Sequence, residues 1–240
     1  MDIGIIGFGR FGQLSVEYLS EDYPVYVFSR SATNQQIQAA GGIASRLEEV
    51  CARDIVLPTV PISAFEETVQ TIAPLLRDNL LIDACSVKEY PADIMRKYIP
   101  EPTQILATHP MFGPDSAGVT LKGQKIVLCP LRVSDGIYDK INRYLKRKGL
   151  TVIETTPENH DRQIAKSQVL THFIGRGLSE FGAEEVDIDT EGYKRLLTIL
   201  EVVGQDTRQL FLDLNKYNRF AAHMRKSFIE ALVDIDEELQ

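Results

Sequence analysis

Ile3-Gly4-Ile5-Ile6-Gly7-Phe8-Gly9-Arg10-Phe11-Gly12 is the stretch that decides the fold of this 240-residue chain. An apolar run ends in a GxGxxG turn, and a helical pattern follows it to about Leu19. In such a turn the first glycine permits the tight bend, the second lets the backbone approach a pyrophosphate, and the third lets helix and strand pack closely. The helix N-terminus offers free N–H groups to the phosphates. We therefore expect a dinucleotide at Gly7, Gly9, Arg10, Phe11 and Gly12, the alternative being a merely structural glycine turn.

Alternation of short Val- and Ile-rich runs with helical segments continues to about residue 155, which is typical of a parallel sheet covered on both faces. We expect strands at the following places: Asp2–Ile6, Val25–Ser29, Ile55–Val60, Leu80–Ala84, Ile105–Thr108, Ile126–Leu128 and Val152–Glu154. After Pro157 apolar residues recur only at helical spacing. The predicted fold is α/β: a Rossmann-type doubly wound parallel sheet over residues 1–155, followed by a small all-helical domain over 156–240.

The helical domain is small enough that its core needs additional burial, and we expect a homodimer formed through it. A net charge of -8 argues against a nucleic-acid partner. The chain shows neither a basic segment before its first apolar run nor about 18 consecutive apolar residues, so we expect no membrane association and a cytoplasmic location. Cys51, Cys85 and Cys129 form no CxxC pair, which predicts buried thiols and no metal site.

The end of the second expected strand indicates which dinucleotide binds. A site for NAD usually has an acidic residue there, whereas Phe28-Ser29-Arg30-Ser31-Ala32-Thr33 contains none. A guanidinium flanked by hydroxyls suits the 2′-phosphate of NADP. We therefore predict NADP, with Ser29, Arg30, Ser31 and Thr59 completing the cofactor site; the alternative for Arg30 is a solvated surface side chain.

Two polar motifs follow neighbouring strands of the expected sheet. Ser86 comes after Leu80–Ala84, and His109 comes after Ile105–Thr108. Ligands of open α/β sheets bind outside the carboxyl ends of the strands, so both side chains should face the nicotinamide end of the cleft. A histidine in this place can accept a proton near neutral pH, although a structural histidine is the alternative.

The surrounding residues resemble one enzyme family. The matching stretches are Ser86-Val87-Lys88-Glu89-Tyr90-Pro91, Thr108-His109-Pro110-Met111-Phe112-Gly113-Pro114, Glu158-Asn159-His160-Asp161 and Ser167-Gln168-Val169-Leu170-Thr171-His172. Together they look like the prephenate/arogenate dehydrogenases, particularly the plant-type arogenate branch, in the right order over nearly the whole chain. The resemblance implies NADP-dependent oxidative decarboxylation of arogenate to tyrosine, or alternatively of prephenate to 4-hydroxyphenylpyruvate.

The same resemblance implies the roles of individual residues. His109 would contact the ring hydroxyl of the substrate and take its proton, and Ser86 would bond near this hydroxyl and orient the histidine. Gln168 and His172 stand four residues apart, on one helical face, and resemble substrate-side residues, with a polar helix face as the alternative. Lys88 would steady its loop or lie near a carboxylate.

Asp206, in Gly204-Gln205-Asp206-Thr207, resembles the acidic residue that marks members preferring arogenate, and its alternative role is an N-cap for the next helix. No arginine for the side-chain carboxylate of the substrate is matched. Two other functions remain open: a reductase of the pyrroline-carboxylate or β-hydroxyacid type, and a domain that senses NADP without chemistry. Neither explains Ser86 together with His109.

Overall fold

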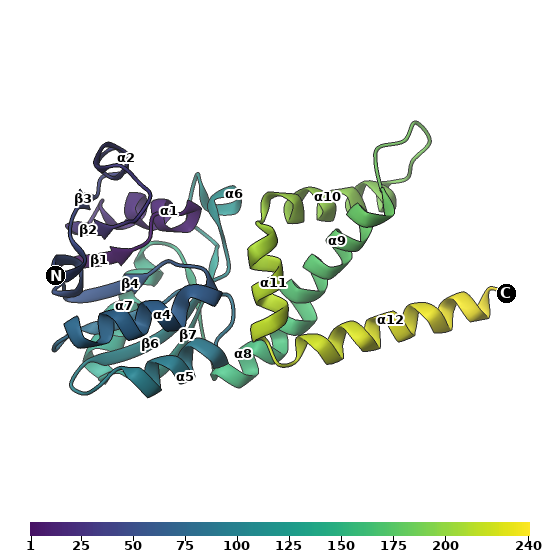
Figure 1. Ribbon diagram of the computed structural model, residues 1–240. Coiled ribbons are helices and arrows are strands. Elements are labelled where there is room, and N and C mark those ends of the chain that lie inside the picture. Colours follow the sequence, from purple (N-terminus) through teal and green to yellow (C-terminus); the bar gives the residue numbers. More distant parts are fainter. The chain divides into compact units, whose positions relative to one another are not determined.

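The computed structural model describes residues 1–240 and divides into two compact units, Met1–Glu158 and Asn159–Gln240 (Figure 1). The first unit is built on an eight-stranded sheet with strand order β3-β2-β1-β4-β5-β6-β7-β8. Its strands are β1 (Ile3–Ile6), β2 (Val25–Phe28), β3 (Ile43–Ala44), β4 (Ile55–Pro58), β5 (Leu80–Asp83), β6 (Gln104–Pro110), β7 (Lys125–Arg132) and β8 (Thr151–Glu154). The predicted α/β class is confirmed.

One pair of strands departs from the expected parallel pattern. β6 and β7 are antiparallel, with His109 opposite Val127, while every other neighbouring pair is parallel. Between them lies only the short helix α6 (Pro114–Ala117). A parallel return needs a crossover of a dozen or more residues, usually with a helix that spans the sheet, and α6 is too short for this. The sheet is thus mostly parallel, as predicted for this fold class, and β6 and β7 form its one antiparallel pair.

The remaining helices of this unit are α1 (Arg10–Leu19), α2 (Asn34–Ala39), α3 (Leu47–Cys51), α4 (Ile62–Ile72), the 3-10 turn η1 (Ala73–Leu75), α5 (Glu89–Tyr98) and α7 (Asp135–Arg147). Val16 of α1 and Ile137 and Ile141 of α7 pack with Ile3 and Leu80 of the sheet. The connecting helices α4 and α5 lie against each other, and the right-handed crossover rule puts them on the opposite face. All three cysteines are buried and unpaired in disulfides.

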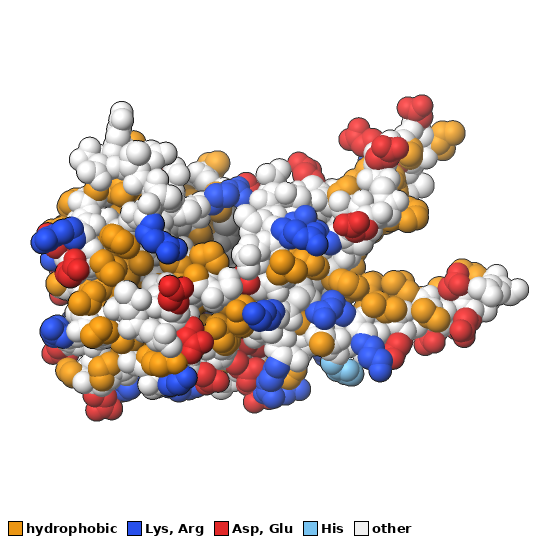
Figure 2. All heavy atoms as spheres, in the orientation of Figure 1, with side chains coloured by type: hydrophobic (Ala, Val, Ile, Leu, Met, Phe, Trp, Pro, Cys, Tyr) orange, Lys and Arg blue, Asp and Glu red, His pale blue; other side chains and the backbone are white.

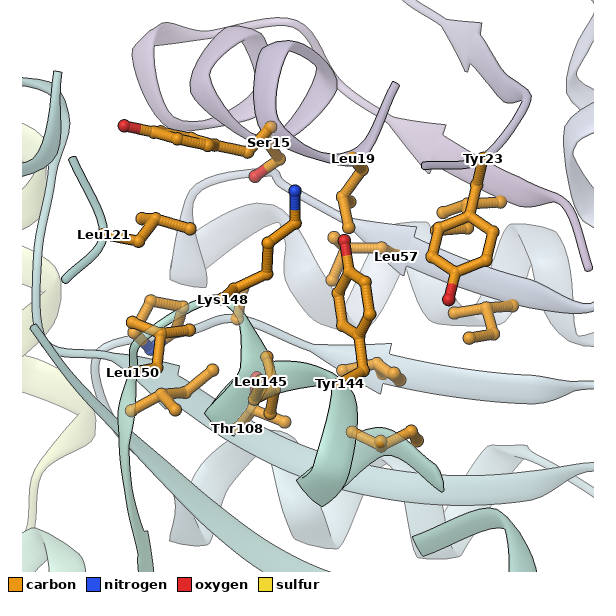
Figure 3. Close-up of a pocket in the computed structure, with 18 of the residues that line it drawn as sticks. Ser15, Leu19, Tyr23, Leu57, Thr108, Leu121, Tyr144, Leu145, Lys148 and Leu150 are labelled. Atoms are coloured by element: carbon orange, nitrogen blue, oxygen red, sulfur yellow. The ribbon is translucent and has the colours of Figure 1, made fainter. Parts of the chain in front are cut away.

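A cavity of about 580 Å³ lies between α1, α7 and the sheet (Figure 3). Its walls are mainly apolar, and the side chains labelled in the figure include Leu19, Leu57 and Tyr144. Thr108 and Pro110 of β6 line it, whereas His109, between them, does not. Successive side chains of a strand point to opposite faces, so His109 is directed away from this cavity. The cavity is therefore not the site of the predicted chemistry.

The second unit consists of helices. They are α8 (Pro157–Ile164), which begins just before the boundary, the π-helical turn η2 (Ala165–Val169), α9 (Leu170–Phe181), α10 (Glu191–Gln205), α11 (Arg208–Tyr217) and α12 (Ala221–Glu238). Helix α9 ends at Gly182, whose φ of 80° lies in the left-handed region that favours glycine. None of the helices has the length and the unbroken apolar character that crossing a bilayer requires.

Candidate functional site

The glycine turn after β1 fits a pyrophosphate. A Cβ at Gly7, where φ is +107°, would lie 2.8 Å from Thr59 O, and one at Gly12 would lie 2.7 Å from Thr59 Oγ1. At Gly9 no atom lies within 4 Å of an added Cβ. Gly7 and Gly12 are thus required by close packing on β4, whereas the space beside Gly9 is open to a ligand. Helix α1 starts at the next residue without a side-chain cap, so its first N–H groups are available to an anion.

The side chains within this turn are engaged by the protein. The Thr59 hydroxyl donates to Gly7 O at 3.1 Å, so Thr59 supports the turn. Arg10 Nη2 donates to Asp115 Oδ1 at 2.6 Å, and the rings of Phe11 and Phe112 lie 6.5 Å apart. Asp115 and Phe112 belong to the segment that follows His109. The structure therefore brings the glycine motif and the segment after His109 together, and the cofactor contacts expected at Arg10 and Phe11 stay a prediction.

The segment after β2 forms a second part of the predicted cofactor site. Ser29 Oγ accepts the N–H groups of Ser31 at 3.3 Å and Ala32 at 3.1 Å, which fixes the loop that carries Arg30. Arg30 is exposed and forms no ion pair with a carboxylate of the chain. Its guanidinium is therefore available to an anionic ligand.

A groove of about 470 Å³ adjoins this loop. It is lined by Phe8 of the glycine turn and by Ser31, Ala32 and Gln36, among other residues. Sequence reasoning missed Phe8 and Gln36. Gln36 could have been found as part of a helix start, because Thr33 and Gln36 have the spacing of a capping box. In the structure they form this box at the start of α2.

A buried ion pair joins the ends of β5 and β6. Lys88 is fully buried, and its ammonium donates to Asp83 Oδ1 and to Thr108 O. Asp83 also accepts the N–H groups of Cys85 at 2.9 Å and Thr108 at 3.2 Å. Burial raises the pKa of Asp83, and the Lys88 ammonium and the two amides oppose this rise. The Lys88 ammonium is thus held inside the protein between Asp83 and Thr108, where it steadies the loop, and its expected contact with a substrate stays a prediction.

Ser86 and His109 flank this ion pair. Ser86 is half-buried in the loop between β5 and α5, and His109 is 3% exposed next to Thr108. His109 lies within β6, which extends to Pro110, rather than after the strand as expected. Because Lys88 and Asp83 fix Thr108, they also fix the backbone that carries His109. The two predicted reaction residues therefore sit on neighbouring, rigidly connected segments.

In the second unit the structure brings His172 and Asp206 together. His172 Nε2 lies 3.3 Å from Asp206 Oδ2, with His172 buried and the Asp206 side chain 34% exposed. If Nε2 carries the proton toward this carboxylate, the other nitrogen of a neutral ring is an acceptor. His172 Nδ1 is buried without a hydrogen-bond partner, as is Gln168 Oε1 one turn earlier in the helix. The π-turn that contains Gln168 is a feature often found at functional sites.

The alternative role of Asp206 as an N-cap is wrong. Helix α11 is capped by Thr207, whose Oγ1 accepts the N–H of Leu210 at 3.1 Å. Asp206 instead follows the end of α10, where its backbone N–H donates to Val203 O at 3.2 Å. Its carboxylate is thus free of the capping role and lies against His172.

Sequence reasoning also missed Arg176 and gave no role to His160 and Asp161. Arg176 Nη2 donates to Asp206 O at 2.8 Å, and the spacing Gln168, His172, Arg176 was the signal that could have found it. His160 Nδ1 lies 2.7 Å from Asp161 Oδ1, and both side chains are buried. Asn218 Nδ2 donates to Asp161 O at 2.8 Å, so this pair ties α8 to the end of α11.

Comparison with known proteins gives two family matches. Residues 24–154 match the model of the prephenate dehydrogenase nucleotide-binding domain, and residues 177–240 match that of the TYRAAT1-like C-terminal domain. Arogenate dehydrogenase 2, chloroplastic, of Arabidopsis thaliana is 32% identical over 253 residues, covering all of this chain and 70% of the plant protein. Arogenate dehydrogenase 1, chloroplastic, of the same plant is 30% identical over 250 residues, and this chain spans only 39% of its length.

The fold also matches a solved structure, that of prephenate dehydrogenase from A. aeolicus in complex with hydroxyphenyl propionate and NAD+. The TM-score is 0.77 at 18% identity, and the match covers all of this chain and 91% of the other. At this identity the likeness concerns the fold.

Proposed function

The chain belongs to the prephenate/arogenate dehydrogenase family, and from this premise we propose that it is an NADP-dependent arogenate dehydrogenase that forms tyrosine. The family membership makes it a nucleotide-binding oxidoreductase. NADP as the cofactor is inferred from Arg30, and arogenate as the substrate is inferred from the side chains around His172.

NADP is favoured by the end of β2. The carboxylate that would accept the ribose hydroxyls of NAD is missing, and the exposed Arg30 lies between two serines. When bound, NADP supplies the hydride acceptor of the reaction. Gly9 and the start of α1 would hold its pyrophosphate, and the groove beside Phe8 and Gln36 would hold its adenosine end.

The proposed chemistry places little demand on the protein beyond positioning. Hydride leaves C4 of the cyclohexadienol ring, the ring carboxylate leaves as CO2, and the electron pair that remains completes the aromatic ring. His109 takes the hydroxyl proton as the carbonyl character develops at C4, and the proton is returned to the ring oxygen as it becomes a phenol. Ser86 orients the histidine and the hydroxyl, and the Lys88–Asp83 pair fixes the strand ends that carry both.

The preference for arogenate is carried by one observation, the acceptor-rich face around His172. Arogenate has an ammonium group where prephenate has a ketone, and an ammonium donates three hydrogen bonds whereas a ketone only accepts them. Gln168 Oε1, His172 Nδ1 and the Asp206 carboxylate are all acceptors, and the first two have no partner in the protein. A ketone would leave them unpaired, and prephenate has no ammonium to offset the repulsion between Asp206 and the side-chain carboxylate that both substrates carry.

The test follows absorbance at 340 nm and identifies the product: the purified chain receives NADP with arogenate or with prephenate, where turnover raises the absorbance. In a separate assay it receives NADPH with a pyrroline carboxylate, where turnover lowers the absorbance. We expect tyrosine and CO2 from arogenate in amounts equal to the reduced cofactor. Reduction of NADP with prephenate but not with arogenate would show that the chain is a prephenate dehydrogenase. Turnover of the pyrroline substrate, or of none, would favour the reductase or the non-catalytic alternative.

We also propose that the protein is a homodimer formed through its second unit. Helix α12 exposes Ile229, Leu232 and Val233 to about half of their full area, at 48%, 51% and 49%. The spacing of these residues puts them on one side of the helix, and Figure 2 shows hydrophobic side chains along it. An apolar face of this kind is typical of a surface that a partner covers.

A further inference from the structure

Three polar residues follow one another at intervals of four in the second unit: Gln168, His172 and Arg176. Residues at this spacing lie on the same side of a helix. The third of them, Arg176, is not explained by the proposed chemistry. Its Nε is buried without a hydrogen-bond partner, so the guanidinium is held in place by its other nitrogens. Such a placement needs a reason, because a buried unpaired donor costs free energy.

The guanidinium of Arg176 donates hydrogen bonds to carbonyls at the C-terminal end of α10. Nη2 donates to Asp206 O at 2.8 Å and to Val203 O at 3.3 Å. These are carbonyls of the last turn of α10 and of the residue that follows it, and Val203 O also accepts the backbone N–H of Asp206 at 3.2 Å. A cation here is also favoured by the helix dipole. Arg176 therefore fixes the backbone of Asp206.

Close packing of α9 on α10 allows this contact. Gly175 precedes Arg176, and a Cβ added there would lie 2.8 Å from Cγ2 of Val203, which is 1% exposed. The absence of a side chain at 175 lets the two helices approach, and the neighbouring guanidinium can then reach the carbonyls. With its backbone held by Arg176, Asp206 presents Oδ2 to His172 Nε2 at 3.3 Å.

We propose that Arg176 is the positioning residue of the proposed arogenate site: it holds the Asp206 carboxylate against His172 and thereby sets the preference for a substrate with an ammonium group. This inference rests on the proposed function. Arg176 acts through Asp206, since its Nη2 donates to the carbonyls of Val203 and Asp206.

Kinetics of Arg176→Gln test the proposal, with Arg195→Gln as the control, because Arg195 is an exposed arginine on α10. We expect the ratio of kcat/KM for arogenate to that for prephenate to fall by about threefold or more, as a charge-assisted contact is loosened. Arg176→Lys, which keeps the charge but not the fork of donors, should restore part of the ratio. An equal loss with both substrates would instead make Arg176 a contact of the carboxylate they share, and would overturn the proposal.

A double-variant comparison sharpens the result. If Arg176 acts through Asp206, then Arg176→Gln added to Asp206→Asn should leave the substrate ratio unchanged within about twofold, because coupled residues are not additive. Independent, additive effects on the ratio would contradict the proposal.

A measurement without substrate separates this inference from the proposed function. In 15N spectra of the histidine rings, we expect His172 to carry its proton on Nε2, toward Asp206, in the wild type. Asp206→Asn and Arg176→Gln should weaken this preference in the same way, and Arg195→Gln should not. If the wild type turns over neither substrate, the proposed function fails while these spectra still decide whether Arg176 positions Asp206. An unaltered His172 spectrum in a folded Arg176→Gln variant would refute it.

Discussion

His109 is buried at 3% exposure, yet its immediate neighbour Thr108 carries the bonds that fix the strand. The backbone at His109 is therefore held by bonds of Thr108 that a change of the His109 side chain does not remove. Replacement by alanine should lower turnover by about 100-fold or more, as expected for a lost general base. Binding of NADP, followed by calorimetry, should remain.

The matched control is His223→Ala, which removes an exposed histidine of α12. It should leave the rate unchanged. A His109→Ala variant with the wild-type rate would exclude the mechanism proposed here, and one that fails to bind NADP would give His109 a structural role instead.

Arg30 provides the second test at the scale of single residues. The exposed guanidinium of Arg30 is the charge nearest in sequence to the end of β2. Arg30→Ala should therefore weaken the binding of NADP by about 1.5–3 kcal/mol, the contribution of a hydrogen bond to a charged group. NAD, which lacks the phosphate, should bind the variant as it binds the wild type. Michaelis constants for the two cofactors check this, and an unchanged constant for NADP would make Arg30 a solvated surface residue.

At the scale of single residues, the sequence names candidates by their residue type but does not show which side chains are buried or what they contact. The lack of an acid after β2 and the pair Ser86 and His109 could be found in the sequence. For Lys88 the sequence left two roles open, because nothing in it shows that Asp83 and Thr108 O bind the ammonium. Arg176 was missed although it continues the spacing of Gln168 and His172, because the sequence does not show that it bonds the backbone carbonyls of Val203 and Asp206.

At the scale of elements, the turn between β1 and α1 separates two uses of glycine. A Cβ at Gly12 meets Thr59 Oγ1 at 2.7 Å, whereas one at Gly9 meets nothing within 4 Å. Gly12→Ala should therefore lower the melting temperature, since the helix must move away from β4. Gly9→Ala should leave the melting temperature unchanged and weaken the binding of NADP, because the methyl group would occupy the space in which we place the pyrophosphate.

Melting curves and NADP titrations of both variants check this contrast. Tight NADP binding by Gly9→Ala would show that the pyrophosphate does not approach the turn. A stable Gly12→Ala variant would show that the packing of α1 on β4 has room for a methyl group.

Most helices and strands could be predicted from the sequence, because the spacing of apolar residues differs between the two kinds of element. The exceptions have physical reasons. Two residues make up β3, too few for a period to emerge, and the antiparallel course of β7 follows from the short α6, which the sequence did not distinguish from a crossover helix. The π-turn at Ala165–Val169 has no sequence signature, although it lies in the motif that contains Gln168.

At the scale of the whole molecule, the two-unit organisation followed from the change of period after Pro157, and the partner of the second unit remains a prediction. Light scattering at micromolar concentration should give a particle of twice the 27.0 kDa chain mass. Leu232→Glu should shift it toward the monomer, because the charge would be placed on the exposed apolar side of α12.

Glu238→Lys, a change of charge on the opposite side of the same helix, is the control and should leave the mass unchanged. A monomeric wild type would contradict the dimer. A dimer unaffected by Leu232→Glu would move the interface to another surface.

The central claim, an arogenate-preferring enzyme, is tested most directly by the ratio of kcat/KM for arogenate to that for prephenate, measured with NADP for the wild type and for Asp206→Asn. We predict that the wild type has a higher kcat/KM for arogenate than for prephenate. Removing the charge beside His172 should shift the ratio toward prephenate by about tenfold or more, equivalent to roughly 1.4 kcal/mol. A wild type that favours prephenate, or an Asp206→Asn variant with an unaltered ratio, would contradict the claim.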